Sequence, residues 1–349
     1  MPKYAPPEKP HHCIKGFTLN LTRHMSKSRN RHHAIVSKPI VSNPIVSEPI
    51  VDDDDDSELS LSVPDTILEI LETTRAIVGP DVSHYQNEIN WTKMVDIQKN
   101  MGFAMCKATQ QFQGKKNIDS KFTHNITQMR ETFSTPAGSR TFDGHTHQIA
   151  FGVYHFAEID PSFIGSDYQG QADWFYNTVA NAVNNNINHF PNFWVLDWED
   201  PKGNSIPHTT RANFAKVFVQ QLHSKLMIKF GESYVPKIFI YTGHYYWGDD
   251  VKMDTTTWFT TYGPKLWMAA YTTNNVLPET HDVSKYNVID KYTNNPKLNL
   301  LNSLDKWIVW QYSSSISVPG ISSVPGISTR CDVSVARSSN DWHSNFYQP

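Results

Sequence analysis

An apolar run that ends in two closely spaced acids is the stretch of the sequence best suited to chemistry. Residues 193–196 are followed by Asp197, Trp198 and Glu199. If the run is a β-strand, Asp197 and Glu199 point to the same face, with their backbones about 6.6 Å apart. Their carboxyl groups can then approach the roughly 5–5.5 Å separation of a retaining glycosidase, and in a cleft shielded from water one of them keeps its proton. Taken alone, the motif equally fits an ordinary strand end with two solvated acids.

Composition narrows the class of protein. The 349 residues suffice for one large domain or two modest ones, and a net charge of −3 at pH 7 gives no argument for a nucleic-acid partner. Cys13, Cys106 and Cys331 do not form a disulfide framework, and a Cys106–Cys331 pair stays open. The sequence shows no apolar run of membrane-spanning length and no secretory signal, which predicts synthesis in, and initial retention in, a cytoplasm.

Residues 1–74 differ in texture from the rest of the chain. A stretch rich in His, Lys and Arg precedes I-V-S-x-P repeats over residues 35–51 and an acidic run at 52–56. Proline at every fifth position excludes a helix or a central strand, so we expect a disordered tail and linker. Attachment to a virion or a cell wall, or no role beyond a spacer, are both compatible with this composition.

Residues 75–349 form the predicted catalytic domain, an α/β fold. Short apolar runs alternate with helical patterns, which is typical of a mostly parallel sheet, and eight of them indicate an irregular TIM-like barrel. We interpret residues 132–148 as a surface loop. Its His145 and His147 lack a third metal ligand at a recognisable spacing. The expected strands are 77–82, 103–107, 150–156, 193–196, 238–242, 266–270, 307–312 and 332–335.

In a parallel barrel, chemistry gathers at the C-terminal ends of the strands. Asp81 lies near the end of the first expected strand, and Asp197 and Glu199 end the fourth. Asp332 lies at the start of the last strand. Because the first and last strands of a closed barrel are neighbours, we expect Asp81 and Asp332 to lie together, across the mouth from the central pair.

Short motifs follow one another in a fixed order over residues 78–349. They are G-P-D-V-S-H-Y-Q at 79–86 with I-N-W at 89–91, F-A-M-C-K-A-T at 103–109, Asp119 with Phe122 and Asn125, G-V-Y-H-F-A at 152–157, L-D-W-E-D at 196–200, residues 237–242, L-W-M-A at 266–269, W-Q-Y-S at 310–313 and C-D-V-S at 331–334. In this order they resemble the motifs of the glycoside hydrolase family 25 muramidases, the Chalaropsis-type lysozymes. The chain departs from that pattern at Gln110, where the family often has Glu after K-A-T.

The resemblance implies a modified (β/α) barrel that cuts the β-1,4 bond from N-acetylmuramic acid to N-acetylglucosamine in peptidoglycan, with retention. It implies Glu199 as general acid and base, and Asp197 as a carboxylate that stabilises the transition state or orients the substrate's acetamido group. Asp81 and Asp332 would support this pair or contact the sugar. No metal or organic cofactor is implied. Five aromatic residues are candidates for the sugar cleft, with core packing as the competing interpretation: Phe156, Tyr241, Trp267, Tyr271 and Trp310.

Other functions remain open from the sequence. A chitinase-like barrel also ends its motif in D-W-E, but it requires a further Asp where this chain has Val195. A non-catalytic glycan-binding protein, or a structural component of a virion or spore wall, is a third class. For the muramidase we expect peptidoglycan glycan strands as the partner and the bacterial cell wall as the place of action, with a phage lysin or a virion-associated lysin as the setting.

Overall fold

The computed structural model describes residues 76–164, 167–199, 206–243, 261–269, 307–317 and 330–347. All of them belong to the second of two compact units, Pro64–Pro349. The expected tail of residues 1–74 and the candidate residue Tyr271 lie outside the described residues. None of the described helices combines the length and apolar composition needed to cross a bilayer.

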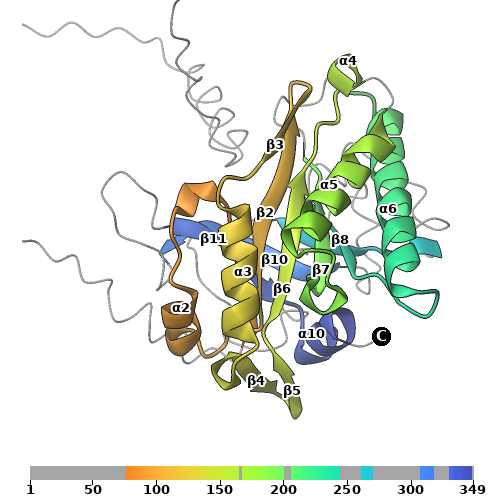
Figure 1. Ribbon diagram of the computed structural model, residues 1–349. Coiled ribbons are helices and arrows are strands. Elements are labelled where there is room, and N and C mark those ends of the chain that lie inside the picture. Colours follow the sequence, from red (N-terminus) through yellow and green to blue (C-terminus); the bar gives the residue numbers. More distant parts are fainter. Residues whose placement is uncertain are drawn as a thin grey trace, which may run out of the picture. The chain divides into compact units, whose positions relative to one another are not determined.

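Eight strands close into a barrel, as predicted (Figure 1). The closing contact is parallel pairing of β1 with β2, and β3 (Lys115–Ile118) extends β2 as a hairpin. All neighbouring pairs in the barrel are parallel except those of the last strand, which runs antiparallel to both its neighbours. In order around the barrel the strands are β1 (Val78–Val82), β11 (Arg330–Ala336), β10 (Trp307–Ser317), β9 (Lys265–Ala269), β8 (Ile238–Gly243), β7 (Phe193–Asp197), β6 (Ala150–Phe156) and β2 (Phe103–Phe112).

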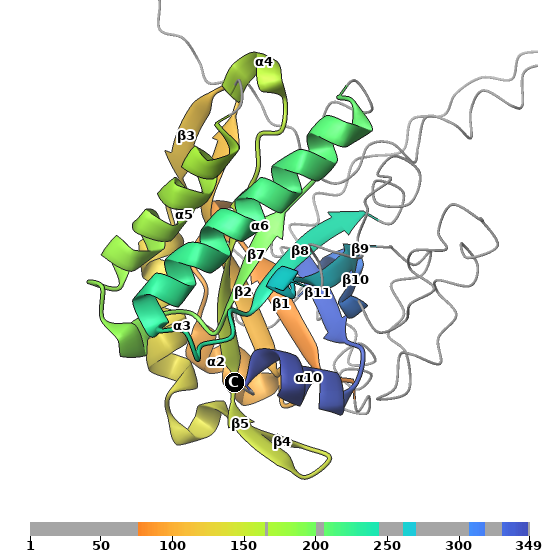
Figure 2. The ribbon, with the colours of Figure 1, turned by 90° about the vertical axis from the view of Figure 1, so that its right-hand side faces the viewer.

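Helices cover the outer face of the sheet. Figures 1 and 2 show α3 (Phe122–Phe133), α5 (Tyr168–Ala182) and α6 (His208–Phe230) against the side formed by β2, β6, β7 and β8. Asp167 caps α5 by accepting a 3.0 Å hydrogen bond from the Gly170 amide. Gly231 ends α6 with a φ of 96°, which a glycine adopts without strain. The remaining helices are α2 (Trp91–Ile97), α4 (Pro161–Ile164) and α10 (Ser339–Phe346).

Aromatic side chains fill the lower interior of the barrel. Phe346 of α10 packs on three strands at once, with ring centroids 5.2 Å from Phe103, 4.9 Å from Phe193 and 5.2 Å from Phe239. A Cβ at Gly79 would overlap the Phe103 ring, and glycine there leaves the ring its space. Because Trp342 Nε1 donates a 3.0 Å bond to the carbonyl of residue 102, just before β2, α10 closes the N-terminal end of the barrel.

The stretch 132–148, expected as a surface loop, instead completes α3 and then forms a hairpin of β4 (Ser139–Phe142) and β5 (His145–Gln148). Asp143 and Gly144 make the turn, both with positive φ. An Asp-Gly pair is a strong signal for a two-residue hairpin turn, so the sequence did contain the information. Cys106 and Cys331, whose pairing the sequence left open, do not form a disulfide: both are buried free thiols.

The hairpin is held against α10 by a stack of imidazoles. His343 lies between His145 and His147, at ring-centroid distances of 4.0 Å and 4.8 Å. His147 Nε2 is 2.6 Å from His343 Nδ1, and Tyr347 stacks on His147 at 4.1 Å. His343 is a third histidine that spacing along the sequence did not reveal. Even so, the described residues include no group of His, Cys, Asp or Glu that could hold a metal ion.

Acid should loosen this contact. Burial, followed by the charges of His343 and His145, lowers the pKa of His147 in the folded protein. The unfolded chain therefore takes up this proton first, and stability that is complete above pH of about 6.5 is lost as the pH falls below it. We expect the urea midpoint to drop less between pH 7.5 and pH 5 in His343→Gln than in the wild type. His124→Gln, at an exposed position on α3, is the control; equal drops in all three proteins would contradict the prediction.

Candidate active site

The interior of the barrel changes from apolar to acidic along β7. Phe193 and Val195 point inward and belong to the buried interior cluster. Asp197 follows at the same period of two and ends the strand, and Glu199 lies two residues further. Asp197 is buried and Glu199 is partly exposed. The alternation thus brings both predicted acids to the C-terminal end of β7, the end of the barrel opposite α10.

Asp81 and Asp332 meet across the β1–β11 pairing. Their Cα atoms are direct partners in the antiparallel register, so their side chains share a face and lie close together. Like charges directly opposite repel, which favours keeping a proton on one of them. Burial raises the pKa of Asp81 to about 6, and burial together with the charges of Asp81 and Glu199 raises that of Asp332 well above its ordinary value. The sequence analysis predicted that Asp81 and Asp332 lie together on neighbouring strands, and the register confirms this.

Gln311 connects Asp81 to a residue on the other side of the barrel. Its Nε2 donates a 2.9 Å hydrogen bond to Asp81 Oδ2, and its Oε1 accepts a 2.7 Å bond from the Tyr241 hydroxyl. Tyr241 is in turn the register partner of Asp197. A buried chain of polar groups therefore runs from β1 through β10 to β8, next to the strand that carries the central acids.

The central pair retains a proton near neutral pH. Burial, followed by the charge on Asp81, raises the pKa of Glu199 to about 7. Burial, followed by the charge on Glu199, raises the pKa of Asp197 well above its ordinary value. Asp197 Oδ1 accepts no hydrogen bond from the described residues, although it is inaccessible to solvent. Raised pKa values of this kind favour a protonated carboxyl near neutral pH, which is what general acid catalysis requires.

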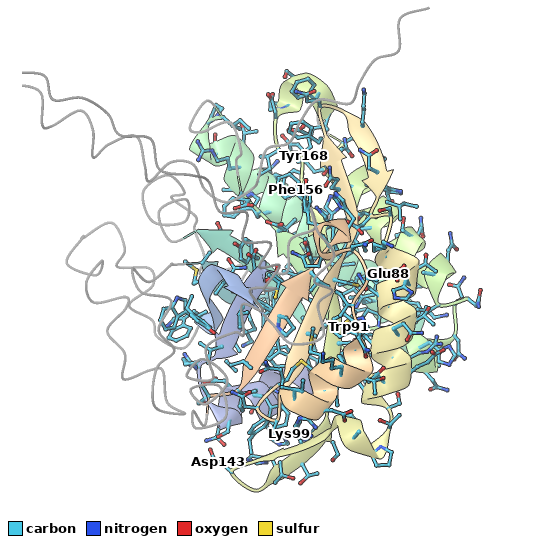
Figure 3. All side chains as sticks on the ribbon, turned by 90° about the vertical axis from the view of Figure 1, so that its left-hand side faces the viewer. Glu88, Trp91, Lys99, Asp143, Phe156 and Tyr168 are labelled. Carbon is cyan, nitrogen blue, oxygen red and sulfur yellow. The ribbon has the colours of Figure 1, made fainter. Side chains whose placement is uncertain are left out.

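The aromatic candidates separate into different environments. Phe156 ends β6 as the register partner of Asp197, and Figure 3 shows it toward the end of the barrel away from Lys99 and Asp143. Tyr241 lies in the interior, bonded to Gln311. Both are therefore close to the acids in the sheet.

Two other aromatic candidates have no free ring face at the mouth. Trp267 is fully buried among interior rings, 5.4 Å from Phe103, and its Nε1 donates a 2.9 Å bond to Ser334 Oγ. Trp310 belongs to the cluster on the outer side of the sheet and packs at 5.9 Å on Tyr312. Both environments are those of core residues, so we leave these two side chains out of the proposed sugar cleft.

Two residues at the mouth had no role in the sequence-based prediction. Lys107 projects inward from β2 with only 6 % of its surface exposed, and its Nζ donates a 3.1 Å bond to Gln110 Oε1. The ring of Tyr85 lies 5.5 Å from this ammonium. A lysine in the middle of the apolar run of β2, at an inward position, was the signal in the sequence. Burial lowers the pKa of Lys107, an effect opposed by Asp119, Asp197, Asp81 and Glu199 in that order.

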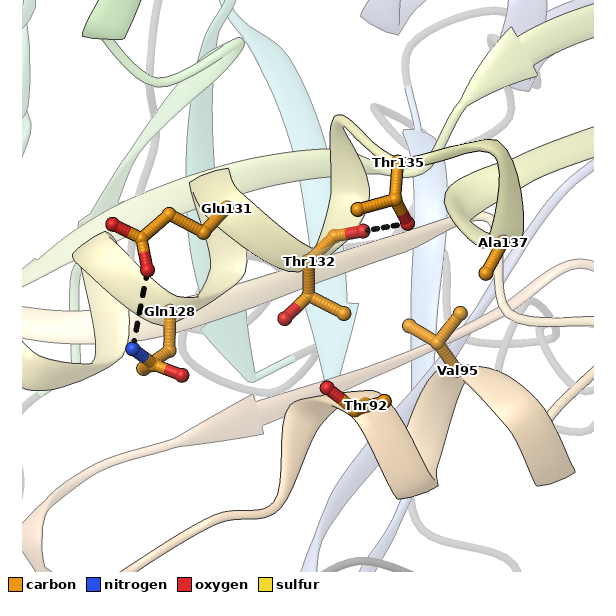
Figure 4. A pocket seen from close by; sticks show the side chains of 7 residues that line it. All are labelled: Thr92, Val95, Gln128, Glu131, Thr132, Thr135 and Ala137. Carbon is orange, nitrogen blue, oxygen red and sulfur yellow. Dashed lines mark hydrogen bonds between the residues drawn. The ribbon is translucent and has the colours of Figure 1, made fainter.

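A hollow on the outer surface does not qualify as the site. Figure 4 shows this groove of about 280 Å³ between α2 and α3. Glu131 is the only acid in its lining, so the groove offers no pair of carboxyls. The groove also lies between helices, outside the sheet. Its lining residues are Thr92, Val95, Gln128, Glu131, Thr132, Thr135 and Ala137.

A family comparison decides the class of the protein. The model described as "Glycosyl hydrolases family 25" matches residues 80–321. The chain belongs to this family. It is therefore a glycoside hydrolase, and the matched region of this family 25 hydrolase includes Asp81, Lys107, Asp197, Glu199 and Gln311. A search of curated proteins found no match.

Three solved structures are similar to this family 25 hydrolase, and the first of them shares its fold. The Clostridium perfringens spore cortex lytic enzyme SleM is 21% identical, with a TM-score of 0.51, over 76% of this chain and 69% of SleM. The modular autolysin LytC of Streptococcus pneumoniae is 18% identical, with a TM-score of 0.45, over 75% of this chain and 46% of LytC. A class V chitinase from Nicotiana tobaccum is 11% identical, with a TM-score of 0.40, over 76% of this chain and 77% of the chitinase.

The bond from Gln311 should hold down the pKa of Asp81. In Gln311→Leu we expect that pKa to rise by about one unit, since a hydrogen bond to a carboxylate stabilises its charged form. Carbon-13 NMR titration of the aspartate carboxyls measures the change. Tyr241→Phe is the control, because it removes the hydroxyl but leaves the Gln311–Asp81 bond; a shift in Tyr241→Phe as large as that in Gln311→Leu would contradict the assignment.

Proposed function

We propose that this hydrolase is an N-acetylmuramidase, which cleaves the β-1,4 bond between N-acetylmuramic acid and N-acetylglucosamine in peptidoglycan with retention of configuration. The observation that carries the proposal is the pair Asp197 and Glu199 at the C-terminal end of β7, with a pKa of about 7 for Glu199. Membership of family 25 supports the reaction type. SleM, which shares the fold, is a spore cortex lytic enzyme and makes bacterial walls the first substrate to test.

Glu199 acts as the general acid in the first step. It donates its proton to the glycosidic oxygen while the bond to the anomeric carbon breaks, and Asp197 stabilises the positive charge that develops on the sugar. The deprotonated Glu199 then removes a proton from the attacking water. Asp197 serves either as the nucleophile or as the carboxylate that orients the substrate's acetamido group for internal attack, and both routes give retention.

Neighbouring groups set the properties of this pair. Burial, followed by the charge on Asp81, raises the pKa of Glu199 to about 7, which favours its protonated form near neutral pH. Asp332, opposite Asp81, belongs to the same electrostatic unit. Phe156 and Tyr241, whose positions in the sheet adjoin Asp197, are the residues that we assign to the sugar side of the site.

The biological setting is part of the proposal. The glycan strands of peptidoglycan are the partner, and the enzyme acts on the bacterial cell wall as a phage lysin or a virion-associated lysin. Residues 75–349 are proposed as the catalytic domain, and residues 1–74 as a linker that attaches it to a virion or a wall.

Removing either central carboxyl should abolish wall lysis. We expect Glu199→Gln and Asp197→Asn to lose about 10²–10⁴-fold in rate, the usual contribution of a positioned acid or base. Turbidity of bacterial walls gives the rate, and reduction and analysis of the new sugar ends identifies the bond that was cut. Glu131→Gln, in the outer groove, is the matched control and should keep wild-type activity.

The same assay separates the alternatives. The muramidase releases muramic-acid reducing ends, and NMR of the first product should show the β anomer. Cleavage of chitin but not of walls would instead indicate a chitinase-like enzyme. Wall binding without new reducing ends would indicate a non-catalytic glycan-binding protein, and full activity of Glu199→Gln would refute its role as the acid.

A further inference from the structure

The side chain of Lys107 extends along β2 from the level of Val195 toward that of Asp197. Lys107 itself pairs with Tyr154, which pairs with Val195 on β7. Its side chain, however, reaches along the strand to Gln110, to which Nζ donates a 3.1 Å bond. Gln110 pairs with Phe156, and Phe156 pairs with Asp197. Since Glu199 lies two residues beyond Asp197, the cation is placed nearer the first acid than the second.

Among the described residues, no carboxylate contacts the ammonium group of Lys107 directly. Its hydrogen-bond acceptor is the uncharged amide of Gln110, and the Tyr85 ring lies over it at 5.5 Å. None of the ion pairs among the described residues includes Lys107. A buried charge that none of these ion pairs neutralises acts on its surroundings through a medium of low polarity, where its influence extends further than in water.

The groups that feel this charge come from every element around the mouth. Lys107 lowers the pKa of each of five acids against the effect of burial, and its attraction to Asp197 exceeds that to Glu199. His84 bonds Asp119 at 2.7 Å and compensates that acid separately. The titratable groups that face the cluster are Asp81 on β1, Tyr85 and His84 on the segment after β1, Asp119 after β3, Tyr154 on β6, Asp197 at the end of β7, Glu199 just after β7, Tyr241 on β8 and Asp332 on β11.

We propose that Lys107 is a positioning residue for the charge of the active site, whose ammonium keeps Asp197 ionised and thereby leaves the shared proton on Glu199. The proposal deepens the proposed function and rests on it. Four acids at one mouth would otherwise leave the location of the proton undetermined, because burial disfavours the charge on each of them. A cation that stabilises the ionised form of Asp197 more than that of Glu199 leaves the proton on Glu199. The side chain of Gln110 contributes because it is uncharged: it accepts a hydrogen bond from the ammonium group of Lys107 without neutralising its charge.

The test is the pH dependence of kcat/KM for soluble peptidoglycan fragments. Activity requires Asp197 ionised, which sets the acidic limb, and Glu199 protonated, which sets the alkaline limb. In Lys107→Met both pKa values rise, so both limbs should move to higher pH, the acidic limb by about one to two units and the alkaline limb by less. The profile therefore narrows as it shifts. Lys107→Arg keeps the charge and should restore the wild-type limbs.

Gln110→Glu tests the same idea without removing the lysine. A carboxylate in contact with Nζ neutralises the cation, so the profile should shift in the same direction as in Lys107→Met, at a partly exposed position that tolerates the change. Lys93→Met on α2 and Gln128→Glu on α3 make the same charge changes on the outer surface and should leave the profile unchanged.

The outcomes separate this proposal from the proposed function. If wild-type protein releases no muramic-acid ends, the function itself fails. If it does, but Lys107→Met and Gln110→Glu keep the wild-type limbs, the role of Lys107 is refuted. Should Lys107→Met not fold, the wild type still gives an answer through the NMR signal of the Lys107 ε-carbon: steps at the pH of the two limbs support the proposal, and their absence overturns it.

Discussion

Repulsion among acids held at one mouth of the barrel is the constraint on which the site depends. Asp81, Asp197, Glu199 and Asp332 come from three strands, and each has its pKa raised by burial. Such a group cannot be fully ionised at neutral pH, because the separate charges would destabilise the fold. Burial of these carboxyls favours a retained proton, Lys107 brings a cation to the same mouth, and the proposed function would use that proton.

The rest of the barrel holds these groups in place. Its lower interior is packed with rings from the strands and from α10, and its polar end is connected by the Gln311 bridge between Asp81 and Tyr241. Carboxyls on separate strands keep their spacing only if the strands do not slide, and small displacements in an active site reduce rates strongly. The packed aromatic rings therefore help to keep the carboxyls in place by making the barrel rigid, without touching them.

Much of the fold could be read from the sequence because apolar runs mark buried strands. Six of the eight barrel strands lie within two residues of the predicted ranges, and β2 and β10 run five residues further than predicted. The period of two places Asp197 on the inward face at the end of β7, and Glu199 follows two residues beyond the strand. Aromatic residues were harder. Trp267 and Trp310 lie on strands as expected, but Trp267 faces the packed interior and Trp310 faces the outer layer. Which side a strand residue faces depends on register, which composition does not give. Tyr241 and Gln311 meet across the barrel, a contact that no local pattern encodes.

Other features escaped for reasons that are equally physical. The hairpin after α3 carried its turn signal in Asp143 and Gly144, but the histidine stack required the distant His343. The role of Lys107 depends on how its flexible side chain runs along β2 toward Gln110, and this is a property of packing. Residue types thus indicated the four acids as candidates, whereas the hydrogen bonds that Gln311 and Lys107 make beside them emerged only in three dimensions.

The position of α10 in the chain determines when the barrel can be completed during synthesis. Phe346 and Trp342 fill the end where β2, β7 and β8 begin, yet they follow every one of these strands in the sequence. Until the ribosome has released α10, the rings of Phe103, Phe193 and Phe239 lack their last partner, and the interior stays open to water. A nascent chain would therefore hold its acids on an incompletely closed barrel, and their spacing becomes fixed only after α10 has emerged and packed.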